Sequence, residues 1–266
     1  GLGIHLPEVP HQDNGFIIAD EVQEEHLPWY KELAEFVCHG LNECGYIFCP
    51  GGIMAQTDEW RQPLATWQKT VRRWATAPTP DAVMRVSIFF DLRSIYGSSQ
   101  LCSELQKTML EQASRNSIFL AALAANALDV KPPLGIFRRF VVDRDGEHRD
   151  SLDLKKRGVL PVTEIVRLHA LAHQLPQVNT NDRLKALAAG KHMTIVDSRN
   201  LADALHFIQH QRIKQQCEQI LRGQKVTNFL NPRDLPKMAK EQLRDAFTII
   251  DEAQSAVRQT YRAGMG

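Results

Sequence analysis

Long hydrophobic runs are missing from this chain of 266 residues, and the stretch GLGIHLPEVPH at its start has neither a basic segment nor an apolar core. These absences argue against a membrane-spanning helix, which needs about 20 apolar residues, and against a secretory signal peptide. Charge of one sign is also scarce, since 32 basic and 31 acidic residues leave a net charge of +1. We therefore expect a soluble protein without general attraction for nucleic acid or acidic membranes.

Cysteine is scarce too: the chain has five, none of them in a CxxC pair. An odd number without paired spacing favours reduced thiols over a disulfide framework or a zinc site, and we expect a cytoplasmic location. The chain also lacks the phosphate-binding motif GxxxxGK[ST], the dinucleotide motif GxGxxG and the nucleophile motif GxSxG, and it has no internal repeat. The cysteines are Cys38, Cys44, Cys49, Cys102 and Cys217.

Two pairs of histidines are spaced four residues apart, as two ligands on one helix face would be. The zincin motif needs Glu directly after the first histidine, but Ala170 and Phe207 stand there, so we interpret both pairs as partly solvated helix residues. They are His169 with His173, and His206 with His210.

The first half of the chain alternates strand and helix patterns, which is typical of an α/β arrangement. Trp60, Trp67 and Trp74 recur every seven residues, a spacing that favours a helix face packed in a core over a base-stacking platform. We predict strands at 16–19, 46–50 and 83–93. We predict helices at 24–45, with Gly45 as its C-cap, and at 59–75, capped by Thr57 or Asp58.

The second half is predominantly helical. A helical pattern runs from about 98 to Pro132, and the segment 137–154 is typical of a hairpin about Asp145-Gly146. We predict a first domain at 1–130 and a helical domain at 131–266, with the short hairpin at its start. The later helices are expected near 161–175, 181–190, 198–222 and 234–262.

Two acidic residues stand at the ends of predicted strands and are candidates for a metal site. Asp13 precedes the first strand, and Asp91 ends the apolar run VSIFFD, where it needs a cation, an arginine or water as partner. Two carboxylates at one sheet edge can hold Mg²⁺, which prefers oxygen ligands. Structural alternatives stay open: Asp13-Asn14-Gly15 is a good turn sequence, and Asp91 can pair with Arg93.

Four blocks of sequence resemble a known family. QDNGFII, GYIFCPGGIMAQTDEWRQPLATW, IFFDLRSIYG and PPLGIFRRF occur in this order. They are similar to the bacterial family of putative nucleotidyltransferases that are often joined to cyclic-nucleotide-binding and CBS domains and that resemble protein-PII uridylyltransferase. The helical stretch from about Pro161 is similar to the C-terminal substrate-binding domain of that family.

The resemblance implies nucleotidyl transfer on a polymerase-beta-like fold of the α+β class, a sheet with flanking helices followed by a helical bundle. It implies Mg²⁺ or Mn²⁺ as cofactor and a nucleoside triphosphate as substrate. Asp13 matches the second carboxylate of the family motif and Asp91 the third; both are the candidate catalytic and metal-binding residues. Arg93 and, more weakly, Arg61 are candidates for phosphate binding.

The chain departs from the family pattern at its start, where a Gly-Ser loop is absent and His11 replaces the first carboxylate. Imidazole is a poor Mg²⁺ ligand. Three explanations stay open: the chain is incomplete at its N-terminus, His11 works with Mn²⁺ or through a water, or the site has lost activity. A longer protein would place cyclic-nucleotide-binding or CBS domains upstream.

Three functional hypotheses follow. The first is a transferase that moves NMP to an acceptor hydroxyl, such as a tyrosine on a regulatory signalling protein. The second is a catalytically degenerate nucleotide-binding sensor module of a longer regulatory protein. The third is an α/β domain whose acidic residues are structural. The nucleotide, the acceptor and the oligomeric state are not encoded in any recognisable motif.

Overall fold

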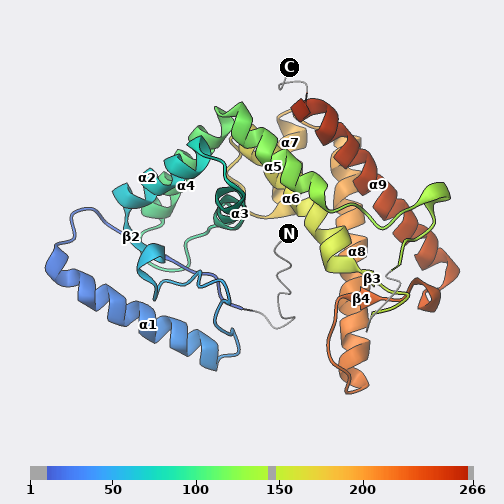
Figure 1. The fold of residues 1–266 in the computed structure, drawn as a ribbon, viewed down its shortest axis with the longest axis horizontal. Helices are drawn as coiled ribbons and strands as arrows, with labels where there is room; N and C mark the ends of the chain where they lie inside the picture. Colours follow the sequence, from blue (N-terminus) through green and yellow to red (C-terminus); the bar gives the residue numbers. More distant parts are fainter. Residues whose placement is uncertain (1–10, 143–147, 263–266) are drawn as a thin grey trace. The chain divides into compact units, whose positions relative to one another are not determined.

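The computed structural model describes residues 11–142 and 148–262, and helices make up 66% of the structure (Figure 1). The mixture of helices with small sheets agrees with the α+β class at this coarse level, whereas a polymerase-beta-like topology stays a prediction. The hairpin predicted about Asp145-Gly146 lies outside the described residues. Within these residues, no helix combines the length and the apolar character that crossing a membrane requires.

The chain divides into two compact units, which are described separately. Unit 1 comprises residues 1–73 and 93–109, and unit 2 comprises residues 74–92 and 110–266. Each unit is therefore built from two segments of the sequence, and the segment that carries Asp91 belongs to the second unit.

Unit 1 contains a two-stranded parallel sheet. Strand β1 (Phe16–Ile18) pairs with β2 (Arg61–Pro63), with Phe16 opposite Arg61. The strand predicted at 16–19 is therefore confirmed. The strand predicted at 46–50 is wrong, because this segment contributes only an isolated bridge between His11 and Ile47.

Helix α1 (Leu27–Glu43) follows a short 3-10 turn, η1 (Glu24–His26), and covers the small core of unit 1. Gly45 has φ of +94°, which confirms its place just beyond the helix end, where a left-handed residue closes the last turn. The core combines small residues and thiols with larger apolar side chains at its edge. Its buried members are Ala34, Cys38, Cys49, Met54 and Ala55.

The tryptophan repeat is confirmed as core rather than surface. Trp60, Trp67 and Trp74 are 3%, 1% and 5% exposed. The helix predicted at 59–75 is wrong in its first part, however. The segment begins with the 3-10 turn η2 (Asp58–Trp60), continues as β2, and is α-helical only from Leu64, in α2 (Leu64–Thr76). Trp67 lies in α2, and its Nε1 donates to the carbonyl oxygen of Phe16 at 2.9 Å, which ties the helix to β1.

The strand predicted at 83–93 is wrong, since residues 83–89 belong to helix α3 (Pro80–Phe89). Thr79 caps the helix by accepting a hydrogen bond from the backbone N–H of Ala82, and Pro80 occupies the first turn. The buried residues recur at intervals of three and four: Ala82, Val83, Val86, Phe89 and Phe90. This helical period outweighs the β-branched and aromatic composition on which the strand prediction rested.

The long helical pattern after residue 98 is confirmed, but it forms two helices, α4 (Ser99–Ser114) and α5 (Ser117–Asp129). Asn116 separates them, because its Oδ1 accepts from the backbone N–H of Phe119 and caps α5. Its Nδ2 also donates to the carbonyl oxygen of Ala75 at 2.7 Å, which fixes the break within unit 2.

The four later helices are confirmed with shifts of a few residues at their ends, and together with α5 they build unit 2. Helices α8 and α9 lie side by side (Figure 1), and a short π-helical turn, η4 (Lys155–Val159), leads into α6. The bounds are α6 (Leu160–Ala172), α7 (Thr180–Ala189), α8 (Ile195–Leu221) and α9 (Lys237–Arg262).

A second small sheet closes unit 2. Strand β3 (Leu152–Asp153) pairs antiparallel with β4 (Phe229–Leu230), and the 3-10 turn η5 (Pro232–Asp234) follows. Another 3-10 turn, η3, spans Ile136–Arg138. The main hydrophobic cluster of this unit has large buried side chains that include Leu152, Leu154, Leu187, Ile208, Leu243, Phe247 and Ile250.

Candidate functional site

His11 and Asp13 lie on the same side of the segment that leads into β1. Side chains two residues apart point to the same face of an extended chain, and here His11 Nε2 lies 3.4 Å from Asp13 Oδ2. The side chain of His11 is 17% exposed and that of Asp13 is 35% exposed. The bridge to Ile47 holds the start of the segment. An imidazole and a carboxylate thus meet at a partly open position.

Gln12 and Asn14 anchor this segment through hydrogen bonds. Gln12 is 5% exposed, and its Nε2 donates to the carbonyl oxygens of Cys38 at 2.8 Å and Tyr46 at 3.1 Å. Asn14 Nδ2 donates to Gln12 Oε1 at 2.9 Å, and Asn14 Oδ1 accepts from the backbone N–H of Ala55 at 2.8 Å. Buried amides are stable where their donors and acceptors are paired. The two amide side chains therefore fix the residues that carry His11 and Asp13.

The turn predicted at Asp13-Asn14-Gly15 is wrong, because these residues form no turn. A Cβ added at Gly15 would approach the carbonyl oxygen of Trp60 to 3.0 Å. Any other residue would push two backbone segments apart, so close packing explains this glycine. Asp13 is positioned by the buried amides on either side of it.

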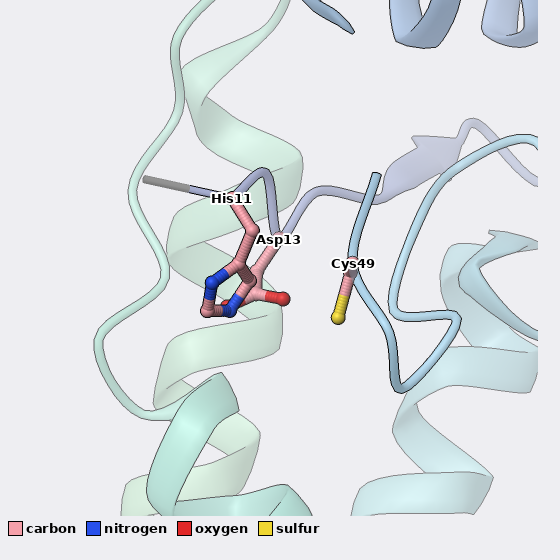
Figure 2. Close-up of side chains that lie close together, drawn as sticks. All are labelled: His11, Asp13 and Cys49. Carbon is pink, nitrogen blue, oxygen red and sulfur yellow. The ribbon is translucent and has the colours of Figure 1, made fainter. Parts of the chain in front are cut away.

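Cys49 brings a thiol to His11 and Asp13 from a distant part of the sequence. It directly precedes the turn Pro50-Gly51-Gly52, which Gly52 closes by donating its N–H to the carbonyl oxygen of Cys49 at 3.0 Å, with φ of +69° at Gly52. One ligand atom from each of His11, Asp13 and Cys49 lies within 4.8 Å of the other two. Figure 2 shows the three side chains together. We call them the His-Asp-Cys cluster.

Cys49 is 7% exposed, and its thiol interacts with the carboxylate of Asp13. Burial raises the pKa of Cys49, and its hydrogen bond to Asp13 raises that pKa further. The sulfur is therefore protonated at neutral pH and donates to Asp13. A transition-metal ion that binds sulfur strongly can displace this proton.

The donor set of the cluster does not fit Mg²⁺. That ion requires oxygen ligands in near-octahedral geometry, and a two-metal site holds its ions between several carboxylates. The cluster offers one carboxylate, one imidazole and one thiol. Nitrogen and sulfur ligands suit the later transition metals instead.

Asp91 lies directly beyond α3, in unit 2, where two arginines hold it. Arg167 Nη2 donates to Asp91 Oδ2 at 2.6 Å, and Arg183 Nη1 donates to Asp91 Oδ1 at 2.7 Å. Their side chains are 9% and 2% exposed, whereas that of Asp91 is 40% exposed. The expectation that Asp91 meets an arginine is confirmed. It does not end a strand, however, and the arginines come from α6 and α7 rather than from position 93.

The two guanidinium groups keep Asp91 ionised. Burial alone would raise the pKa of Asp91, but the hydrogen bonds and positive charges of Arg167 and Arg183 outweigh it and lower the pKa. Arg183 also donates to the carbonyl oxygens of Gln177 at 2.6 Å and Phe90 at 3.2 Å. One carboxylate therefore joins the end of α3 to α6 and to α7.

The two candidate phosphate-binding arginines have different surroundings. Arg61 is nearly buried; its Nη1 donates to the carbonyl oxygens of Ala55 at 2.7 Å and Gln56 at 3.1 Å, and its Nη2 pairs with Asp58. These contacts hold the segment before β2. Arg93 is exposed in the connection between α3 and α4. A phosphate contact of either arginine stays a prediction.

Of the predicted site residues, His11 and Asp13 lie together, in unit 1, and Asp91 has its own partners in unit 2. Sequence reasoning missed Cys49, Arg167 and Arg183. The position of Cys49 directly before a Pro-Gly-Gly turn is a signal that could have drawn attention to it. For Arg167 and Arg183 the sequence offers no signal, because they lie 76 and 92 residues from Asp91.

The histidine pairs do not form metal sites among the described residues. His206 and His210 are exposed on α8, as expected. His169 is a half-buried residue of α6, which agrees with the expectation of a partly solvated helix residue. Tyr261 Oη lies 3.4 Å from its Nδ1, and burial, together with the charge of His173, lowers the pKa of His169 to about 4. His173 instead stacks on His192 at 3.7 Å between ring centroids.

Comparison with protein families gives two matches, which follow each other along the chain. The family model described as putative nucleotidyltransferase matches residues 9–81. The model described as putative nucleotidyltransferase substrate binding domain matches residues 117–261. Neither the curated proteins nor the solved structures gave a match to this chain. The first matched segment contains the whole His-Asp-Cys cluster.

Proposed function

Because the chain belongs to the family of putative nucleotidyltransferases with a C-terminal substrate-binding domain, we propose that it transfers a nucleotidyl group from a nucleoside triphosphate to an acceptor hydroxyl. The observation that carries the proposal is the place of Asp13 within the first matched segment. Its carboxylate is partly exposed and is held by anchored neighbours. Such fixed placement is what catalysis by orientation requires.

The proposed reaction is an in-line displacement at the α-phosphorus. The acceptor oxygen forms a bond to this phosphorus, the bond to the bridging oxygen of the β-phosphate breaks, and pyrophosphate leaves while the hydroxyl proton passes to a base. Asp13 is the described carboxylate of the cluster that can take up this proton. Arg93 and Arg61 are proposed to contact the phosphates. Mn²⁺ is the activating ion that we propose.

The acceptor is proposed to bind the helical part of the chain, because the second family match is described as a substrate-binding domain. A protein side chain with a hydroxyl group, as in the modification of a signalling protein by protein-PII uridylyltransferase, is the acceptor class we propose. Asp91 matches the third carboxylate of the family motif and is proposed as a further metal ligand. That role stays a proposal, and its two arginine contacts mean that folding must be measured whenever this residue is changed.

One observation favours a second function, a nucleotide sensor without turnover. The cluster contains a single carboxylate, and His11 stands where the family motif has its first. A nucleotide then binds through its base, ribose and phosphates, but the transfer step lacks one of the carboxylate metal ligands of the family motif. A module of this kind would report nucleotide levels to other domains of a longer protein.

A transfer assay distinguishes the two functions. The purified chain is incubated with each of the four α-labelled nucleoside triphosphates, with Mg²⁺ or Mn²⁺, and with a cell extract as the source of acceptors. We expect labelled acceptor and released pyrophosphate, and a loss of about 100-fold in Asp13→Asn. Glu24→Gln, an exposed acidic residue of the same unit, is the matched control and should leave transfer unchanged.

His11→Asp tests whether the histidine has ended catalysis. Label that appears only in this variant would show that the fold is competent and that the natural site has lost a ligand. Saturable nucleotide binding without transfer in every variant would support the sensor function. Absence of both binding and transfer would overturn the proposed nucleotide site.

A further inference from the structure

We propose that His11, Asp13 and Cys49 form a binding site for a thiophilic divalent transition metal, with Zn²⁺ as the expected ion, in preference to Mg²⁺. The proposal shares Asp13 and His11 with the proposed transferase and adds Cys49 and the class of metal. Its test uses metal binding in the absence of nucleotide. Failure of this proposal is therefore distinguishable from failure of the transferase.

The three ligand atoms are already close enough to converge on one ion. They lie within 4.8 Å of one another without metal, and ligands bound to one Zn²⁺ at about 2.0–2.3 Å are separated by about 3.3–3.8 Å in tetrahedral geometry. Small side-chain rotations therefore bring the imidazole nitrogen, one carboxylate oxygen and the sulfur into range. Figure 2 shows the three side chains close together.

The chemistry of the three groups selects the metal. Thiolate and imidazole bind Zn²⁺ and other late first-row ions far better than Mg²⁺, which retains water and prefers oxygen. On binding, the Cys49 thiol loses its proton to the solvent, and the thiolate, the neutral imidazole and the carboxylate become the three ligands. Three protein ligands leave one tetrahedral position for water or a substrate oxygen, which is the arrangement of catalytic rather than structural zinc.

The surroundings of the cluster hold the backbone of all three ligands before metal arrives. Gln12 and Asn14 hold the backbone of His11 and Asp13 through hydrogen bonds to Cys38, Tyr46 and Ala55. The Pro50-Gly51-Gly52 turn follows Cys49, whose side chain belongs to the buried core of unit 1. A site with fixed ligands binds an ion at a smaller entropic cost than ligands that must be ordered on binding.

Cobalt provides a direct spectroscopic test, because Co²⁺ replaces Zn²⁺ in tetrahedral sites and a cobalt–thiolate bond gives a charge-transfer band in the near ultraviolet. The full chain, without a histidine tag and kept reduced, is titrated with Co²⁺ and then with competing Zn²⁺ or Mg²⁺. We expect one equivalent of Co²⁺ with the thiolate band, displacement by Zn²⁺, and no displacement by Mg²⁺ in large excess.

Variants identify the ligands. Cys49→Ser should abolish the thiolate band, and His11→Ala and Asp13→Ala should each weaken binding by more than about 10-fold. The matched controls are Cys44→Ser and His26→Ala, which change an exposed cysteine and an exposed histidine of the same unit and should retain wild-type binding. Circular dichroism verifies the fold of each variant.

Two results would overturn the proposal: wild-type protein that binds Co²⁺ without a thiolate band, or a band that persists in Cys49→Ser and is lost in Cys44→Ser. The wild-type spectrum is decisive even where a variant fails to fold. Protein that binds Zn²⁺ through these residues yet transfers no nucleotide would support the metal site and contradict the transferase.

Discussion

At the scale of single residues, Asp91 has the strongest contacts of the predicted site residues, and they are contacts with buried cations. The side chains of Arg183 and Arg167 are nearly inaccessible to water, so both guanidinium groups have lost most of their hydration. The carboxylate of Asp91 compensates for part of this loss, and removing it takes that compensation away. This is a structural consequence that holds whether or not Asp91 also takes part in catalysis.

We predict that Asp91→Asn lowers the free energy of unfolding by about 2–3 kcal/mol. A fully buried pair that loses one partner is destabilised by about 3–5 kcal/mol, and the 40% exposure of the Asp91 side chain reduces that figure. Urea denaturation measures the effect. Asp81→Asn, which removes the exposed ion pair with Arg85, is the control and should change stability by less than about 1 kcal/mol. Equal effects of the two substitutions would contradict the structural role of Asp91.

The residue scale also shows what spacing can and cannot reveal about a site. His11 and Asp13 are two residues apart, so an extended chain is sufficient to bring them together, and the sequence identified both. Cys49 lies close to His11 and Asp13 only because the folded chain brings distant segments together. Arg167 likewise contacts Asp91, from which it is 76 positions away in the sequence. Contacts of this kind depend on tertiary packing, which no local pattern specifies.

At the scale of elements, α3 shows how composition and period compete. Val83, Val86, Ile88, Phe89 and Phe90 are residues that favour strands, yet the buried positions are spaced for a helix. Thr79 and Pro80 supply a start signal that agrees with the helical spacing. The long helices α8 and α9 were predictable because spacing, caps and composition all agree there, whereas the small sheets have strands of only two or three residues and little pattern to detect.

We predict that Thr79→Ala destabilises the protein by about 1 kcal/mol, because the helix start loses the acceptor for the N–H of Ala82. Thr79→Ser keeps the hydroxyl group and should retain most of the stability. Thermal unfolding followed by circular dichroism compares the two variants. If serine were as destabilising as alanine, the hydroxyl would not be the group that stabilises the start of α3.

At the scale of the whole molecule, the chain combines two units that carry different kinds of ionisable group. Unit 1 holds the His-Asp-Cys cluster at a partly open position. Unit 2 holds ionised Asp91 between two arginines and neutral His169 against Tyr261. The carboxylate of Asp91 and the imidazole of His169 both make stability depend on pH. The pH ranges in which they act differ, because the ordinary pKa is 3.8 for the carboxylate and 6.5 for the imidazole.

We predict that stability falls as the pH is lowered from about 6.5 to about 4, and that His169 causes much of this fall. Burial and the charge of His173 lower the pKa of His169 to about 4 from 6.5, so between these values the unfolded chain binds a proton that the folded chain does not. The full effect is about 3 kcal/mol. Asp91, whose pKa is lowered from 3.8, contributes its own loss only at more acidic pH.

The variant His169→Gln isolates this effect, because glutamine stays neutral throughout the range. Between pH 6.5 and 4, the unfolding free energy of the variant should depend less on pH than that of the wild type. Some dependence should remain, because the pKa of His173 is also lowered by burial and by His192. His206→Gln, at an exposed position of α8, should reproduce the wild-type curve. Urea denaturation at a series of pH values measures the three curves, and parallel curves for His169→Gln and the wild type would show that His169 is not protonated on unfolding.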